Sequence, residues 1–372
     1  MRWNARAVAQ QLLEANDHAA MIATLSRYRT HFALVGSLCV IAVGFSILSY
    51  LPKSNLGTSS LERVDSAVDF QKEKDYWHTQ ITSIGGEDAY REMVKKGNSM
   101  TASQSHVMAH SFWEALFQAR GVEGFAVCGP HFVYGCYHQF IGNAIAAVGL
   151  PVVEKFRAAC ASKPRSTIFP CLHGLGHGIL GYLGYSLEDL KEALALCEAS
   201  NLGEDRNGCI DGVFMEYNIH GLTAYKSGKI EPRKFPGEGA YSPCFDVNAQ
   251  YRAQCVYQLP DWWVAAILSP GDIGGRFAQA GIYCSNMNDT TLTQVCFEGI
   301  GHIAQSLSNL DPDAAAALCA SAAPPDYRAS CLSSAALRFK LEGFKDYLGL
   351  CERFGLSEDG LVRCRKFENK TS

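Results

Sequence analysis

Two pairs of histidines in this sequence have the spacing of metal ligands. His106 and His110 stand four residues apart, and so do His173 and His177. In a helix, this spacing puts both imidazoles on one face, where they can bind a single ion. Imidazole suits zinc, iron and copper, so the pairs predict a divalent transition-metal site of unassigned metal. Because only neutral imidazole binds metal, affinity should fall below pH about 6.5, the ordinary pKa of histidine.

Other polar residues share the register of these pairs. Segments such as CYHQFIG, CLHGLGHG and CFEGIGHI start at a cysteine, and a polar residue follows two positions later. In CLHGLGHG and CFEGIGHI, a histidine also follows six positions after the cysteine. The metal-ligand candidates in this register are His106, His110, His138, His173, His177, Glu298 and His302. Further candidates at or near it are Asp211, Glu216, Tyr257 and Asp261. The glycines between His173 and His177 would leave space for a ligand. Alternatively, the glycines serve helix packing and the polar residues are structural or solvent-facing.

The chain contains none of the common catalytic or nucleotide-binding motifs. It has no G-x-S-x-G elbow, no H-E-x-x-H, no P-loop and no dinucleotide fingerprint. Catalytic residues therefore stay unassigned. The net charge of −4 over 372 residues predicts no nucleic-acid partner.

The cysteines indicate the elements that would position these residues. Fourteen of the fifteen follow the apolar run that contains Cys39, and they occur as closely spaced couples. The couples are Cys128/Cys136, Cys160/Cys171, Cys197/Cys209, Cys244/Cys255, Cys284/Cys296, Cys319/Cys331 and Cys351/Cys364. Stretches rich in helix formers separate them, so we expect a disulfide within each couple to join one helical hairpin to the next. Sequence alone does not fix this connectivity, and free buried thiols are the alternative.

The spacing predicts an all-α fold of about seven disulfide-linked helical hairpins, forming a solenoid or a closed α/α toroid. Each hairpin would begin with a cysteine that opens its first helix and end with a second helix that closes on a cysteine. The first hairpin would begin near Gln104 without an opening cysteine.

The stretches EALALCEASNLGEDRNGC, AAALCASAAPPDYRASC and FRAACASKPRSTIFPC carry a family resemblance. They are similar to the cysteine-rich, tetratricopeptide-like repeat proteins of bacteria, which are secreted arrays of αα-hairpins. The resemblance covers about residues 104–366 and is architectural. It implies recognition of peptides or cell-envelope components, whereas the histidines are not required by that family.

A charge-free run near the N-terminus predicts one transmembrane helix, Phe32–Leu51. Arginines at positions 2, 6, 27 and 29 precede it, so the positive-inside rule places the N-terminus in the cytoplasm. We therefore expect a cytoplasmic segment at 1–31, a stalk and leading helices at 52–103, and a periplasmic or extracellular repeat domain at 104–372. A cleaved signal peptide is the alternative.

Two functions fit these predictions. We favour a membrane-anchored, extracytoplasmic binding protein for an envelope protein, peptide or glycan, with a histidine-rich metal site on its repeat face. The alternative is a metal-dependent enzyme, in which the hairpins form a toroid and the histidines and carboxylates line its active site.

Overall fold

The computed structural model describes residues 69–365 except 101, 199–202, 221–232, 234–238, 268–271, 309, 342–343, 345 and 353–355. All regular structure in this part is helical, and no strand occurs in it, which confirms the predicted all-α class. No helix within these ranges combines the length and apolar composition that a membrane crossing requires. The predicted cytoplasmic segment and the predicted span Phe32–Leu51 lie outside the described residues.

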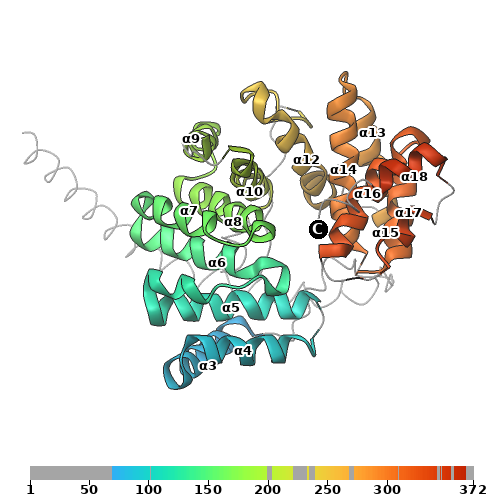
Figure 1. Cartoon of the computed structure of the whole chain (residues 1–372). Coiled ribbons are helices and arrows are strands. Elements are labelled where there is room, and N and C mark those ends of the chain that lie inside the picture. The colour runs from blue at the N-terminus through green and yellow to red at the C-terminus, as the bar shows by residue number, and fades with distance from the viewer. Residues whose placement is uncertain are drawn as a thin grey trace, which may run out of the picture. The chain divides into compact units, whose positions relative to one another are not determined.

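One helix from each predicted hairpin belongs to a series that we call the first helices. These are α5 (Ala102–Arg120), α6 (His131–Val148), α8 (Arg165–Leu183), α10 (Arg206–Ile219), α12 (Arg252–Trp262), α14 (Thr290–Leu307) and α16 (Pro325–Leu341). Each packs against the next one along the chain (Figure 1). Because the packing is sequential, equivalent positions of successive units come to lie side by side.

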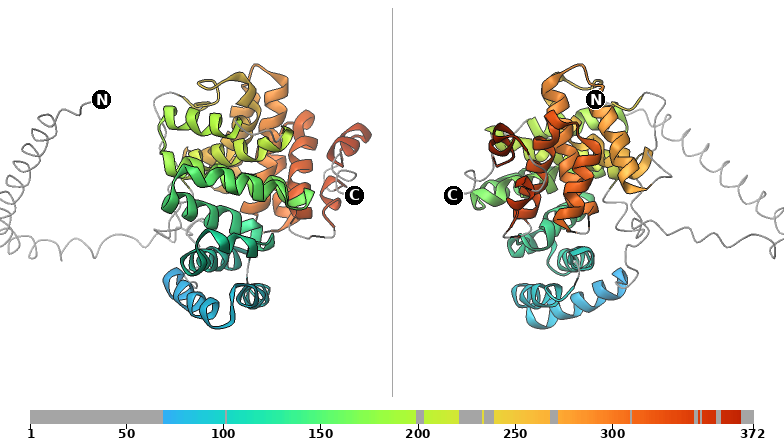
Figure 2. Two further views of the ribbon diagram at one scale, coloured as in Figure 1. Left: turned by 60° about the vertical axis from the view of Figure 1, so that its left-hand side comes forward. Right: turned by 90° about the vertical axis from the view of Figure 1, so that its right-hand side faces the viewer.

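The remaining α-helices lie outside this series. They are α3 (Phe70–Ile84), α4 (Gly86–Gly97), α7 (Val153–Ala161), α9 (Leu187–Glu198), α13 (Ile273–Ser285), α15 (Pro312–Ala322), α17 (Gly349–Glu352) and α18 (Glu358–Cys364). The leading helices α3 and α4, at the blue end of the chain, pack on α5 (Figure 2). Helix α13 packs on α15. The segment interpreted as a stalk with leading helices thus holds two helices within its described part.

All seven predicted disulfides are present, with Cα–Cα distances of 5.4 to 5.7 Å. They join Cys128 to Cys136, Cys160 to Cys171, Cys197 to Cys209, Cys244 to Cys255, Cys284 to Cys296, Cys319 to Cys331 and Cys351 to Cys364. The local connectivity is therefore confirmed, and the alternative of free buried thiols is wrong for these fourteen cysteines.

The predicted place of the second cysteine of each couple needs a correction. We expected these cysteines to open the first helices, but the helices begin earlier in the sequence. The cysteines in question lie three to six residues inside their helices: Cys136 in α6, Cys171 in α8, Cys209 in α10, Cys255 in α12, Cys296 in α14 and Cys331 in α16. All six are buried, and all of them except Cys209 are completely so. They are core residues of helix interiors rather than residues of exposed helix ends.

Capping residues and prolines explain the earlier helix starts. Helix α14 begins six residues before Cys296, because the Asp289 side chain caps it by accepting from the Leu292 amide at 3.0 Å. Helix α16 begins at Pro325, a residue that favours the first position of a helix. The disulfides are therefore attached to the interiors of the first helices rather than to the loops before them.

Glycines bring neighbouring first helices into backbone contact. A Cβ on Gly212 of α10 would overlap the carbonyl oxygen of His173 on α8, and one on Gly176 would overlap that of Cys209. The space expected for a ligand beside Gly176 is thus filled by the neighbouring helix. This close approach brings residue 211 directly against the His173 ring.

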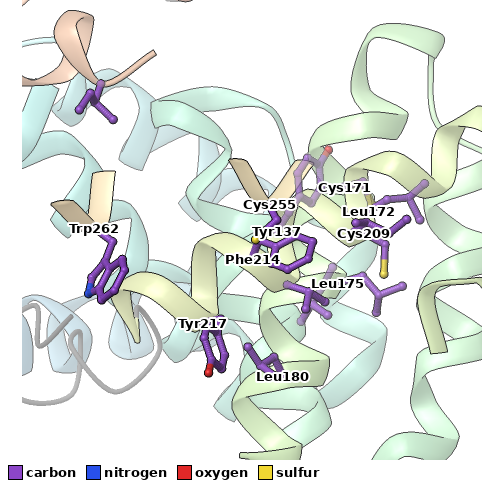
Figure 3. Close-up of a cluster of buried hydrophobic side chains, with 14 of the residues drawn as sticks. Tyr137, Cys171, Leu172, Leu175, Leu180, Cys209, Phe214, Tyr217, Cys255 and Trp262 are labelled. Atoms are coloured by element: carbon purple, nitrogen blue, oxygen red, sulfur yellow. The ribbon is translucent and has the colours of Figure 1, made fainter. Parts of the chain in front are cut away.

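A continuous apolar core fills the space between the first helices. Figure 3 shows members of it that come from different helices, among them Leu175 of α8, Phe214 of α10 and Trp262 of α12. Trp262 and Trp263 are fully buried, and their indole nitrogens donate to backbone carbonyls at 2.7 Å. These tryptophans are therefore core residues.

Candidate metal site

Three histidines from two adjacent helices form a compact group, which we call the His triad. His138 lies on α6, and His173 and His177 lie one turn apart on α8. Each can offer one ring nitrogen such that all three nitrogens lie within 4.8 Å of one another. The Nε2 atoms of His173 and His177 are 3.1 Å apart. Two nitrogens bound to one tetrahedral zinc would be about 3.3 Å apart, so the triad could hold a metal ion.

The far side of each α8 imidazole faces a carboxylate of α10. His177 Nδ1 lies 2.7 Å from Glu216 Oε2, in a hydrogen bond between two buried side chains. His173 Nδ1 lies 2.9 Å from Asp211 Oδ2, a close contact whose geometry is less well aligned than that of the His177–Glu216 hydrogen bond. Metal-bound histidines usually have such a partner on the second nitrogen, since it fixes the ring and its tautomer.

These carboxylates are themselves held in place. Gln258 of α12 donates to Asp211 Oδ1 at 2.6 Å, and the Tyr185 hydroxyl donates to Glu216 Oε1 at 2.6 Å. Burial opposes ionisation of Asp211, but the nearby His173 and Gln258 outweigh it, so the pKa of this carboxyl is lowered. Asp211 is therefore a hydrogen-bond acceptor. Glu216 is also an acceptor, and its side chain is fully buried.

Burial lowers the histidine pKa values around this group. It lowers the pKa of His173, and it lowers the pKa of His110 and His138 well below the ordinary value, with neighbouring histidines adding to the effect. These rings are neutral at physiological pH and available as ligands. Competition from protons should consequently begin at a lower pH than the value of about 6.5 expected for an unperturbed imidazole.

The predicted pair on α5 lies next to the triad. His106 Nε2 and His110 Nε2 are 3.0 Å apart, and the His110 ring centroid is 6.5 Å from that of His138. The centroid of His138 is in turn 4.8 Å from that of His177. The structure thus brings five predicted histidines from three consecutive units together: His106, His110, His138, His173 and His177.

The candidates of the later units have other partners. His302 Nδ1 lies 3.1 Å from the Tyr257 hydroxyl, which is also 3.4 Å from Ser334 Oγ. Glu298 accepts from a neighbouring glutamine of its own helix. Burial raises the pKa of Asp261 to about 6, but among the described residues no contact joins it to the histidines. None of these residues belongs to the three-residue group.

One cation belongs to the same face as these later residues. Arg338 lies one helical turn after Ser334 on α16, so the two residues share a side of that helix. Burial, followed by the Arg338 charge, lowers the pKa of His302 to about 3. Arg338 also acts on His173, whose pKa is lowered first by burial. The seventh unit is therefore close enough to influence the third.

Several residues that hold the site escaped the sequence prediction. Gln139 and Gln258 each follow a cysteine by three positions, both are buried, and each bonds a site residue. Their shared position was a usable signal. Tyr185 and Arg338 carry no such signal, because their positions do not recur in the repeat pattern.

Comparison with known proteins gives no further guide to this site. No family model, curated protein or solved structure matches the chain. Its function must be argued from the geometry alone.

Proposed function

We propose that this protein binds a divalent transition-metal ion at the His triad and presents it on a repeat array outside the cytoplasm. One observation carries the proposal. The two imidazoles of α8 direct their Nε2 atoms toward each other at 3.1 Å, while both Nδ1 atoms face carboxylate oxygens of α10.

The tautomers explain why this arrangement favours a cation. Asp211 and Glu216 can only accept when ionised, so the proton of each neutral imidazole belongs on Nδ1. Both Nε2 lone pairs of His173 and His177 then point at one another, which is repulsive unless a metal ion, or an additional proton on one ring, lies between them. A divalent ion satisfies both, and His138 supplies a third nitrogen, since its ring has no hydrogen bond to another described residue. Zinc, iron and copper all accept three imidazoles.

The rest of the molecule supports an array outside the cytoplasm. Seven disulfides are expected of an oxidising compartment rather than of the cytosol. With Phe32–Leu51 as a membrane anchor, the array would be periplasmic or extracellular. The sequential packing of the first helices supports a solenoid. Such a face would bind an envelope protein, peptide or glycan.

A metal-dependent enzyme is the second candidate, and the polar group of the later units favours it. The Tyr257 hydroxyl contacts both His302 and Ser334. Arg338 lies one turn after Ser334 and could hold an anionic substrate beside the ion. Three protein nitrogens leave the fourth position of a tetrahedral ion open, as in catalytic zinc sites. Turnover by the zinc-loaded protein, lost on chelation, would favour this candidate over binding alone.

The test is a zinc competition titration of the purified full-length chain. Replacing His173 and His177 together with alanine should strongly weaken zinc binding at the triad. The loss should exceed the 10- to 100-fold that is typical when a metal-bound histidine loses its hydrogen-bond partner. His302→Ala is the matched control, since His302 occupies the same repeat position as His177 and should leave zinc affinity unchanged. Unchanged affinity in the double variant, with the helical content intact, would show that these histidines are structural.

A further inference from the structure

The histidine pair on α5 repeats the arrangement found on α8. His106 and His110 lie one turn apart, and their Nε2 atoms are 3.0 Å apart, against 3.1 Å for His173 and His177. His110 is fully buried. The two pairs thus have the same internal geometry in the first and third units.

The acceptors of the α5 pair also come from the following unit. His106 Nδ1 lies 2.9 Å from the carbonyl oxygen of Phe132, and His110 Nδ1 lies 3.0 Å from Gln139 Oε1. A carbonyl oxygen can only accept, so His106 carries its proton on Nδ1.

The same tautomer holds for His110 because the Gln139 amide has a determined orientation. Its Nε2 lies 3.2 Å from Asn143 Oδ1 and 3.4 Å from Glu114 Oε2, both of which are acceptors. Its Oε1 must then be the atom that faces His110, which makes Nδ1 the protonated nitrogen. Both Nε2 lone pairs of the α5 pair therefore point at each other, as they do on α8.

We propose that His106 and His110 hold a second divalent transition-metal ion, so that the first helices carry two neighbouring metal sites with His138 between them. The position of His138 supports this assignment, because its ring centroid is 6.5 Å from that of His110 and 4.8 Å from that of His177. The second site rests on the proposed function, since the same tautomer argument assigns both ions. It has two protein nitrogens of its own, and water or an exogenous ligand completes its coordination. Imidazole ligands make zinc, iron, copper or nickel suitable ions.

The experiment measures zinc per chain in the purified full-length protein after loading with zinc and removal of the excess. Two zinc ions are expected in the wild type and one after His106 and His110 are both replaced with alanine. Replacing His173 and His177 should also leave one, while His302→Ala should retain two. The wild-type stoichiometry needs no variant to fold, so it tests the proposal by itself.

The outcomes separate the two proposals. One zinc per chain that is lost only with His173 and His177 would overturn the second site and retain the first. One zinc per chain that is lost in either double variant would indicate a single shared ion, which also overturns the second site. No bound zinc in the wild type would overturn both proposals.

Discussion

The third and sixth units place polar residues at the same two repeat positions, but they use them differently. In the third unit, His173 and His177 direct Nε2 atoms toward each other, with carboxylates behind them. In the sixth unit, Glu298 bonds within its own helix and His302 turns Nδ1 toward Tyr257. Spacing of four residues is common to both, so spacing alone does not make the site.

The difference lies in what the following unit supplies. Helix α10 offers Asp211 and Glu216 to the histidines of α8, and helix α6 offers Phe132 O and Gln139 to those of α5. Helix α16 belongs to the unit that follows α14. Among its described contacts, Ser334 contacts Tyr257 rather than His302. An acceptor behind Nδ1, which fixes the tautomer, is therefore the feature that separates the proposed metal pairs from the pair of the sixth unit.

The largest expected effect compares matched glycines in these two regions. A Cβ at Gly212 would overlap the carbonyl oxygen of His173, and one at Gly299 would overlap that of Tyr257. Each Gly→Ala variant should lower the free energy of unfolding by about 1–3 kcal/mol, because backbone cannot yield as a flexible side chain does. Only Gly212→Ala should also weaken zinc binding, since it displaces Asp211 from His173. Urea unfolding and zinc titration measure the two effects, and equal zinc affinities in both variants would break the comparison.

The next effect concerns the buried carboxylate behind His177. Glu216→Gln keeps the shape and a hydrogen-bond acceptor but removes the charge, so zinc affinity should fall by about 10- to 100-fold. Tyr257→Phe removes the partner of His302 in the later units and serves as the matched control with unchanged affinity. Competition titration with a chromophoric chelator provides the measurement. A loss in both variants would mean that the two regions form one extended site.

Much of the fold follows from the sequence because its signals are local. Cysteine couples such as Cys197/Cys209 predicted bonds that the structure confirms, since a short loop leaves each cysteine one near partner.

The helix starts were less predictable than the bonds. The expectation that Cys136, Cys171, Cys255 and Cys331 open their helices is wrong, because each lies inside a helix that starts upstream. Caps such as Asp289 lie before the cysteine in a stretch whose polar composition resembles a loop. The first helices therefore extend further toward the N-terminus than the cysteine pattern suggested.

The sequence predicted which histidines are candidate ligands, but not which of them lie together. The repeat register identified His138, His173 and His177, because stacked units align equivalent positions. It could not separate them from His302, whose environment depends on Tyr257 in the preceding unit, 45 residues away. Which acceptor lies behind each ring is a property of helix packing, and the sequence contains no local record of it.

The smallest effect is a pH dependence that tests whether His302 belongs to the structural group. Burial and then Arg338 lower the pKa of His302 to about 3 in the folded protein, against about 6.5 when unfolded. As pH falls below about 6.5, the unfolded state takes up this proton first, so stability is lost between roughly pH 6.5 and pH 3. One such group contributes at most about 1.4 kcal/mol per pH unit in that window. His302→Gln should remove this contribution, so the stability difference between wild type and variant should decline as pH is lowered from 6 to 4.5.

The same measurement with and without zinc distinguishes a structural His302 from a ligand. Urea unfolding of the wild type and His302→Gln would be compared at each pH, once with a chelator and once with saturating zinc. A structural histidine contributes equally in both conditions, because zinc bound at His173 and His177 leaves its proton equilibrium unchanged apart from weak charge effects. If zinc instead stabilised the wild type more than His302→Gln, so that the difference between the two proteins grew when zinc was added, His302 would be a metal ligand. The contrast between the third and sixth units would then be wrong, and the sixth unit would have to be counted as part of the site.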